Sequence, residues 1–441
     1  MVAYLSVIEQ YLNRYAEPEA GLAEQVVHKT YRNTLIIPCF DEAENFLDHV
    51  LPRGMADLLV IVVVNAPQNA PEGALQRTAR LMGSLTGGAS RMIGVVPYSG
   101  THNVDVLVID RASNGRRVPP RQGVGLARKI GADISLKLYQ RGSIIEPWLY
   151  STDADATLPE VYFTTQLEPE AVNLFGFHHK SQDPHLHASG QLYETYLRYY
   201  VNRLRHAGSP YAYHTLGSTM AIPVCAYAKV RGFPKRNAGE DFYVLNKLAK
   251  VGPIHSLLAP EIELQSRAST RVPFGTGPAI IRMPEDPTCY LSYAPECFDE
   301  LKALLDNLRS AQPGTPWQNL DVADKALQAL GFFEFFARAQ RQFKSPTTLQ
   351  KALHQWLDAF RTLRFIHEIR HTYGDVPLLE TLDVLLGTPA DGHLERLRNL
   401  ERGAIGDMGT ASHKQAPASV QAQGTHPTFR SGSKLAGQRH H

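Results

Sequence analysis

The chain has 441 residues, of which 43% are hydrophobic and 20% are charged, and 45 Lys and Arg residues nearly balance 43 Asp and Glu residues. This composition excludes a disordered or collagen-like chain, because it is apolar enough to bury a large core. The formal net charge of +2 argues against a broad nucleic-acid-binding face, which needs clustered Lys and Arg side chains. The length is sufficient for two or three domains.

The cysteine and hydropathy patterns predict a soluble intracellular protein. Four cysteines occur without a CxxC or CxxH spacing, so neither a zinc ribbon nor a disulfide scaffold is expected. The first 20 residues are acidic and amphipathic at helical spacing, unlike a signal peptide. Because 18 apolar residues never follow one another, no transmembrane segment is expected either. We therefore expect a cytoplasmic location.

Between residues 34 and 155, short apolar runs rich in β-branched residues alternate with longer helical or loop segments. The runs cover residues 34–38, 58–64, 104–110 and 148–155. Continuous apolar runs joined by long crossovers are typical of a parallel sheet covered on both faces, which is an α/β architecture. Polar residues follow each run, and ligands of open α/β sheets bind beyond the carboxyl ends of the strands. The functional site is expected there.

From about residue 296 the pattern becomes helical, with apolar residues at positions i, i+3, i+4 and i+7. The helical segments cover residues 298–311, 322–343, 349–373 and 394–403. Residues 404–441 have no periodicity and one aromatic residue, so they are predicted to be disordered. We expect an α/β domain over residues 1–295, a helical region over 296–403 and a tail over 404–441.

The strongest local signal is the pair of carboxylates Asp153 and Asp155 at the end of the fourth apolar run. Two carboxylates two residues apart at a strand end can both reach one divalent cation. Hard oxygen ligands suit Mg²⁺ or Mn²⁺ bridging a diphosphate. The alternative is a solvated turn, which is the more frequent explanation for such a pair alone, because Asp is a common turn and N-cap residue.

Other motifs accompany this pair in a fixed order, at residues 34–45, 121–131, 217–222, 230–234 and 239–242. Over about residues 32–275, the ordered set resembles the family 2 glycosyltransferases and their relatives of the GT-A fold. That family reads approximately as a V-x-I-P-x-[YF]-N-E strand, a G-x-[AG]-x-A-R-N helix, a D-x-D strand end, a G-G-F-P segment and a G-E-D segment. The resemblance implies a GT-A-type nucleotide-binding fold with a mainly parallel central sheet in residues 1–295, and a glycosyltransferase of the hexosyltransferase class.

The resemblance also implies where a nucleotide-sugar donor binds. The implicated residues are Pro38, Cys39, Phe40, Asp41, Glu42, Asn65, Arg121, Arg128 and Asp153. Asn65 stands where the family usually has an Asp that contacts the base, and an amide both donates and accepts, so the base stays open. Guanidinium groups suit phosphate oxygens, and Arg121 or Arg128 is the candidate within a basic cluster whose other members are expected on a solvated face.

Asp153 and Asp155 match the metal motif of the family, which implies Mn²⁺ or Mg²⁺. Some relatives use a later His as a third ligand. His255 and His214 are the candidates in this chain, and His255 is the expected ligand. A group of five residues also invites a metal interpretation, but its spacing fits no familiar zinc site, and a solvated loop is expected. The group comprises His178, His179, Asp183, His185 and His187.

Asp241 matches the catalytic base of inverting members of the family, and Glu240 lies beside it. A positioned carboxylate can accept the proton that an acceptor hydroxyl loses during attack. The alternative is structural, since Gly239-Glu240-Asp241 also has the pattern of a helix N-terminus with acidic residues in its first turn. A retaining mechanism stays open. The Gly- and Arg-rich segment 266–277 is expected to be either a lid whose arginines meet the donor phosphates or a surface loop.

Two other functions remain open. A sugar-phosphate nucleotidyltransferase would share the sheet and the carboxylates, but usually carries a Gly-rich basic loop after strand 1, where this chain has residues 41–44 with three acidic side chains. A non-catalytic nucleotide-sugar-binding scaffold would use the helical region for assembly. The expected partners are a nucleotide-sugar donor and an unidentified hydroxyl acceptor, without nucleic acid, and oligomers are possible.

Overall fold

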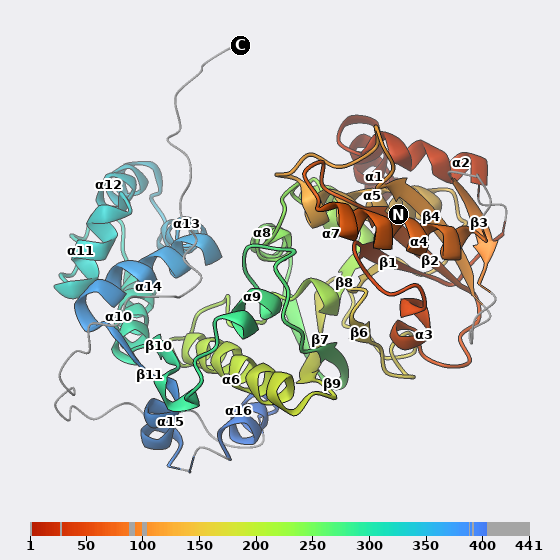
Figure 1. Ribbon diagram of the computed structural model, residues 1–441. Helices are drawn as coiled ribbons and strands as arrows, with labels where there is room; N and C mark the ends of the chain where they lie inside the picture. Colours follow the sequence, from red (N-terminus) through yellow and green to blue (C-terminus); the bar gives the residue numbers. More distant parts are fainter. Residues whose placement is uncertain are drawn as a thin grey trace.

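The computed structural model describes residues 2–26, 29–87, 93–98, 104–387, 389 and 392–403. Within these residues, nine strands form one sheet in the order β3-β4-β2-β1-β5-β8-β7-β9-β6. Figure 1 shows this sheet with its helices in one part of the molecule and the C-terminal helices in another. The predicted tail, residues 404–441, lies outside the described residues.

The strands of the central sheet are β1 (Asn33–Cys39), β2 (Leu58–Asn65), β3 (Ile93–Pro97), β4 (Asp105–Arg111), β5 (Trp148–Ser151), β6 (Ala156–Thr157), β7 (Val172–Lys180), β8 (Met220–Pro223) and β9 (Ile254–Gln265). The helices around it are α1 (Val2–Arg14), α2 (Ala23–Val26), α3 (Phe46–Val50), α4 (Glu72–Thr86), α5 (Gly123–Gln140), α6 (Pro184–His206), α7 (Val224–Lys229), α8 (Glu240–Leu248) and α9 (Thr276–Ile281), with the 3₁₀ turns η1 (Pro18–Leu22), η2 (Gly217–Thr219) and η3 (Pro287–Cys289).

The four predicted apolar runs form the parallel strands β1, β2, β4 and β5. Every residue of β1 and β2 is buried, because helices cover both faces of the sheet. Along β2, Val60 and Val62 pack with α3 and α4, whereas Ile61 and Val63 pack with α5. The fourth run ends sooner than predicted: β5 stops at Ser151, which places the Asp pair in the turn before β6.

The other half of the sheet is mixed. β8 runs antiparallel between β5 and β7, while β9 is parallel to β7. β3 and β6 are antiparallel to their neighbours. The predicted α/β class, the mainly parallel central sheet and the helical C-terminal region are confirmed.

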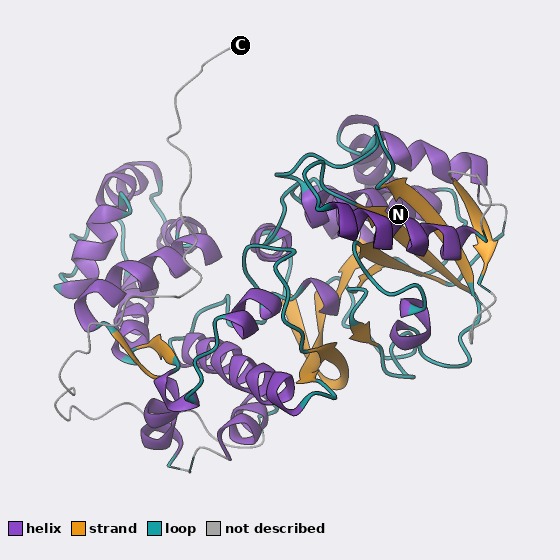
Figure 2. Ribbon diagram, in the orientation of Figure 1, coloured by secondary structure: helices purple, strands orange, loops and turns teal. Residues whose placement is uncertain are grey.

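The C-terminal helices are α10 (Glu296–Ser310), α11 (Val322–Ala329), α12 (Phe332–Gln342), α13 (Pro346–Trp356), α14 (Ala359–Tyr373), α15 (Leu378–Leu386) and α16 (His393–Glu401), and a small antiparallel pair, β10 (Leu291–Tyr293) and β11 (Asp375–Pro377), lies among them (Figure 2). Two predicted long helices are split. Gly331, at a φ of 73°, separates α11 from α12. Asp358 is the N-cap residue at which α14 begins, and its carboxylate accepts from the Arg361 backbone N–H at 3.1 Å.

The C-terminal helices share a core with α6, to which Leu192, Tyr199 and Leu204 contribute. The tyrosines at helical spacing in residues 193–200 lie on α6, as their spacing predicts. No helix in the described part of the chain is long and apolar enough to cross a bilayer.

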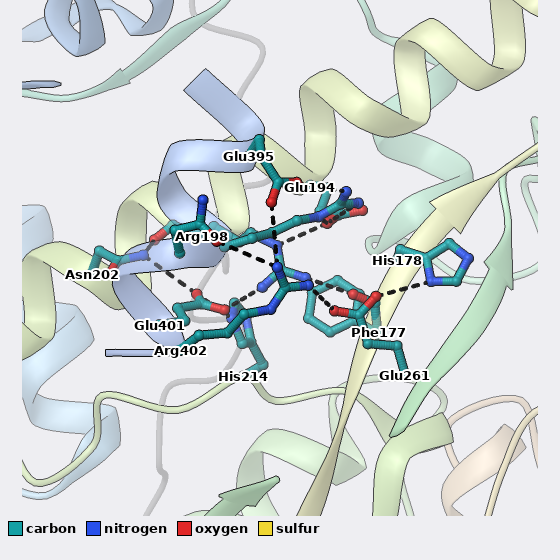
Figure 3. A network of polar contacts seen from close by, with 12 residues as sticks. Phe177, His178, Glu194, Arg198, Asn202, His214, Glu261, Glu395, Glu401 and Arg402 are labelled. Atoms are coloured by element: carbon teal, nitrogen blue, oxygen red, sulfur yellow. Dashed lines mark hydrogen bonds and ion pairs between the residues drawn. The ribbon is translucent and has the colours of Figure 1, made fainter. Parts of the chain in front are cut away.

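Helix α16 is held against α6, β7 and β9 by a network of ion pairs (Figure 3). At its centre, the buried Arg198 pairs with Glu401 of α16 and donates to Glu194 at 2.8 Å. Arg398 reaches Glu194 at 2.9 Å, and Arg402 reaches Glu261 at 2.9 Å. Burial alone would raise the pKa of Glu194, but His179, Arg198 and Arg398 outweigh it, so this pKa lies well below its ordinary value.

We expect Glu194→Gln to lower the free energy of unfolding at pH 7 by about 3 kcal/mol, because it removes the buried carboxylate that Arg198 and Arg398 share. Since the folded-state pKa of Glu194 is depressed, its contribution is complete above its unfolded pKa and declines as pH falls below about 4.5. The variant should therefore lose less stability than the parent on acidification.

Denaturant unfolding from pH 3 to 7 measures this. Glu395→Gln is the matched control, because Glu395 pairs with Arg398 and Arg402 but is 60% exposed. The control should change stability by less than about 0.5 kcal/mol. Equal effects of the two variants would contradict a central role for Glu194.

Candidate functional site

Arg128 of α5 brings three separate sequence motifs together. Its Nε donates to Glu240 at 2.8 Å, and its Nη2 pairs with Asp153. Its Nη1 donates to Ser151 Oγ at 2.7 Å and to the Gly217 carbonyl at 3.0 Å. The guanidinium group therefore links the end of β5, the turn η2 and the start of α8.

A charged group with a 3% exposed side chain needs compensating partners. Burial lowers the pKa of Arg128, but the carboxylates of Asp153 and Glu240 outweigh this effect and leave it above its ordinary value. The cation is therefore permanent. Arg128, which the resemblance implicates in donor binding, directs these donors to protein atoms.

Two glycines allow this arrangement. A Cβ at Gly217 would lie 2.4 Å from Arg128 Nη2, so any side chain there would displace the guanidinium group. A Cβ at Gly125 would lie 2.4 Å from the Pro234 carbonyl, which shows how closely the loop before α8 packs on α5. That packing places Glu240 within reach of Arg128.

A second cluster of charges lies at the same edge of the sheet. Arg267, in the loop after β9, donates from both Nη1 and Nη2 to Glu42 at 2.7 Å and also contacts Asp155 at 2.7 Å. Arg271 of the same loop donates to Glu42 and to the Phe40 carbonyl, the latter at 2.7 Å. The segment predicted as a lid or loop thus binds the carboxylates of the site directly.

The edge holds more carboxyl groups than guanidinium groups. Its five carboxylates are Glu42, Asp153, Asp155, Glu240 and Asp241, and its three guanidinium groups are Arg128, Arg267 and Arg271. Burial and the neighbouring charge of Asp155 raise the pKa of Glu42 to about 8, although Arg267 opposes them. Burial likewise raises the pKa of Asp155, and the Asp153 charge adds to it. A bound cation would relieve this repulsion.

The fit of a divalent cation is partial. Asp153 and Asp155 offer carboxylate oxygens, and their side chains are 35% and 25% exposed. However, across the described ranges no group of three or more His, Cys, Asp and Glu side chains is arranged to hold a metal ion. Further ligands would have to come from the diphosphate and from water, as hard cations allow.

His255 does not supply a third ligand, which corrects the prediction. It is exposed near the start of β9, opposite Asn173, whereas the far end of that strand reaches the site through the Gln265 N–H and the Asp155 carbonyl. At the usual rise of a strand, these two ends lie more than about 20 Å apart. The other candidate, His214, contacts Glu401 in the network around α16.

Asp241 lies in the first turn of α8, after Gly239 at a φ of 70°. Burial raises the pKa of Asp241 to about 7, the neighbouring Glu240 contributes to the rise, and the Phe242 N–H and Arg128 partly oppose it. Its Oδ1 accepts from the Phe242 N–H at 2.7 Å. Glu240, in contrast, is buried on Arg128, so the two adjacent carboxylates have different environments.

The remaining predicted donor residues separate into three kinds. Pro38, Cys39 and Asn65 are buried at the strand ends. Asp41 turns away to α4, where it accepts from Arg77 Nε at 2.6 Å. Arg121 is exposed and has no hydrogen bond or ion pair to another described residue, so it is the available cation near the start of α5.

Two details were not anticipated from sequence. Lys129, next to Arg128, points to the N-terminal helix and contacts Tyr11 at 2.6 Å and Asp133 at 2.8 Å. The predicted histidine loop is instead ordered structure: His178 and His179 belong to β7, and Asp183 caps α6 by accepting from the His185 N–H. His187 lies within α6, and its Nδ1 accepts from the Ser181 N–H at 3.4 Å.

Comparison with protein-family models gives no match, and neither does comparison with curated protein sequences. Two solved structures are similar to this chain at low identity. S. aureus TarS 1-349 in complex with UDP-GlcNAc has 11% identity and a TM-score of 0.33, over 85% of this chain and 91% of that chain. The mannosyltransferase PcManGT from Pyrobaculum calidifontis, in complex with GDP-Man and Mn²⁺, has 16% identity and a TM-score of 0.31, over 91% and 94%. Both scores are low, so neither likeness supports an assignment.

We expect Arg128→Met to lower the free energy of unfolding by about 3–5 kcal/mol, because it leaves Glu240 as an unpaired buried charge. Glu240→Gln should cost less, since an amide still accepts from the guanidinium group. The double variant should cost less than the two single variants together, by on the order of 1–3 kcal/mol. Denaturant unfolding of all four proteins measures this coupling, and strict additivity would contradict the ion pair.

Proposed function

We propose that the protein is a glycosyltransferase, which transfers a hexosyl group from a nucleotide-sugar donor to a hydroxyl acceptor. The observation that carries the proposal is the contact of Arg128 with both Asp153 and Glu240. It joins the D-x-D and G-E-D motifs, about 90 residues apart in sequence, at the carboxyl edge of the sheet. Asp153, which is proposed to bind the metal and diphosphate, and Glu240, which lies beside the proposed base Asp241, then contact one guanidinium group.

The donor diphosphate belongs at Asp153 and Asp155. A divalent cation, Mn²⁺ or Mg²⁺, held by these carboxylates and by the diphosphate would neutralise the charge that develops on the leaving group. Arg121 is exposed and has no partner among the described residues, so it is available to contact the phosphates. The nucleoside is proposed to bind at the adjoining strand ends and the loop after β1, which comprise Pro38, Cys39, Phe40, Glu42 and Asn65.

Asp241 is the proposed base. The acceptor oxygen attacks the anomeric carbon, the bond from that carbon to the diphosphate oxygen breaks, and the hydroxyl proton passes to the Asp241 carboxylate. Attack opposite the leaving group inverts the anomeric configuration. A pKa of about 7 suits the role, because a base is most effective near its operating pH. Glu240 holds Arg128 and raises the pKa of Asp241, which makes it a positioning residue.

We expect Asp241→Asn to lower kcat at least 100-fold, since an amide cannot accept the proton. In the parent protein, activity should rise with pH through about 7, because only ionised Asp241 is a base. The variant should also be more stable than the parent at pH 8, because the folded-state pKa of Asp241 is raised and its ionisation opposes folding as pH rises from about 4 to 7.

A panel of UDP-, GDP- and ADP-sugars, with product analysis and thermal unfolding, measures these effects. Glu72→Gln is the matched control. Glu72 also lies in the first turn of a helix, α4, but this helix is far from Asp241 in sequence. Full activity of Asp241→Asn would overturn the assigned role. Retention of the anomeric configuration would overturn inversion, and release of pyrophosphate from a nucleoside triphosphate would indicate a nucleotidyltransferase.

Arg267 is expected to compete with the cation, because both need Asp155. Arg267→Ala should therefore tighten Mn²⁺ binding about tenfold, which corresponds to about 1.4 kcal/mol. Calorimetric titration with Mn²⁺ alone measures the change. Arg77→Ala is the control, since its partner is Asp41 on the side of α4. Weaker Mn²⁺ binding in Arg267→Ala would contradict the competition.

A further inference from the structure

A pocket lies at the amino ends of the parallel strands, the edge opposite to Asp153 and Asp155. Its volume is about 640 Å³. The first residues of three strands line it: Asn33 of β1, Leu58 of β2 and Trp148 of β5. The proposed glycosyltransferase chemistry uses only the carboxyl ends of these strands, so it leaves this pocket without a role.

One wall of the pocket is aromatic. Trp148 and Phe163 are partly exposed, and Tyr150 lies between them in the wall, with its ring centroid 5.1 Å from that of Phe163 in an edge-to-face arrangement. Leu167 and Pro169 extend this apolar surface. Predominantly apolar and aromatic walls with a few polar groups are typical of small-molecule sites.

The other side of the pocket is polar. Asn33 is 7% exposed, and its Oδ1 has no hydrogen-bond partner among the described residues. A buried acceptor of this kind costs about 1–3 kcal/mol when no donor meets it. At the rim, Arg32 and Glu146 form an ion pair at 3.1 Å with side chains 68% and 31% exposed. Both can contact a ligand while they stay paired.

These features point to a neutral, hydroxyl-rich ligand. Arg32 is neutralised by Glu146, and Asp57 adds a further negative charge, so the lining does not favour an anion. A sugar presents an apolar C–H face to aromatic rings, and its hydroxyl groups both donate and accept. They can donate to Glu146 and Asp57 and accept from Arg32 at the rim.

We propose that this pocket is a saccharide-binding site, separate from the donor site, which takes a neutral oligosaccharide. Binding there needs no catalysis and does not depend on the proposed function. If the protein transfers sugars, the site would hold an acceptor glycan near the enzyme between transfers and raise its effective concentration.

Tryptophan fluorescence tests the proposal. The chain has three tryptophans. Trp148 lines the pocket, whereas Trp317 and Trp356 contact Phe332 among the C-terminal helices. The probes are neutral tetrasaccharides of glucose, mannose and N-acetylglucosamine, added to the full chain. We expect a saturable change in emission with at least one of them, absent in Trp148→Phe, which keeps an aromatic wall and should still bind by calorimetry.

Substitutions then locate the site. Phe163→Ala and Arg32→Ala should each weaken binding at least fivefold, and the exposure of Arg32 makes its replacement compatible with folding. Arg80→Ala is the matched control, since Arg80 is an exposed arginine that pairs with Glu44 on another surface. Asp241→Asn should bind the saccharide as the parent does, which separates this result from any failure of the proposed transfer reaction.

Three outcomes would overturn the proposal. The first is the absence of saturable binding to every tetrasaccharide in the panel. The second is binding that Phe163→Ala and Arg32→Ala both leave unchanged. The third is binding that Asp241→Asn abolishes, because the saccharide would then occupy the acceptor position beside Asp241.

Discussion

The structure of the candidate site depends on one buried cation. Arg128 projects from α5 to the end of β5 and satisfies Asp153, Glu240, Ser151 and a backbone carbonyl at once. A guanidinium group can do this because its donors are fixed in a plane and its charge is permanent. Without it, Glu240 would be a buried charge without its guanidinium partner.

Around this cation, the edge of the sheet is short of positive charge. Glu42 and Asp155 crowd together, and Arg267 reaches across from the loop after β9 to bind both of them. Under the proposed function, an incoming metal ion and diphosphate would replace these contacts that the protein makes with itself. Burial, with the neighbouring charge of Glu240, raises the pKa of Asp241 into the range in which a carboxylate is a useful base.

The two edges of the parallel strands have different characters for a physical reason. At the carboxyl edge, strand ends and the start of α8 bring charged side chains together. The amino edge instead carries aromatic residues near Asn33, whose Oδ1 has no partner in the described part of the chain. The short strand β5 contributes to both, with Trp148 at one end and the Asp pair just past the other. An elongated sugar polymer and a nucleotide sugar would thus meet different surfaces of one sheet.

The sequence by itself determined the α/β class, the parallel strands and the C-terminal helices, because burial on both faces and helical periodicity leave local patterns. It also indicated Asp153, Asp155 and Asp241 through the order of their motifs. Only the tertiary structure decided that Arg128 faces the site while Lys129 faces α1, that His255 lies far from the Asp pair, and that Arg267 binds Glu42. These outcomes depend on contacts between segments that lie more than 100 residues apart in sequence. Local sequence patterns do not indicate which of these segments become neighbours.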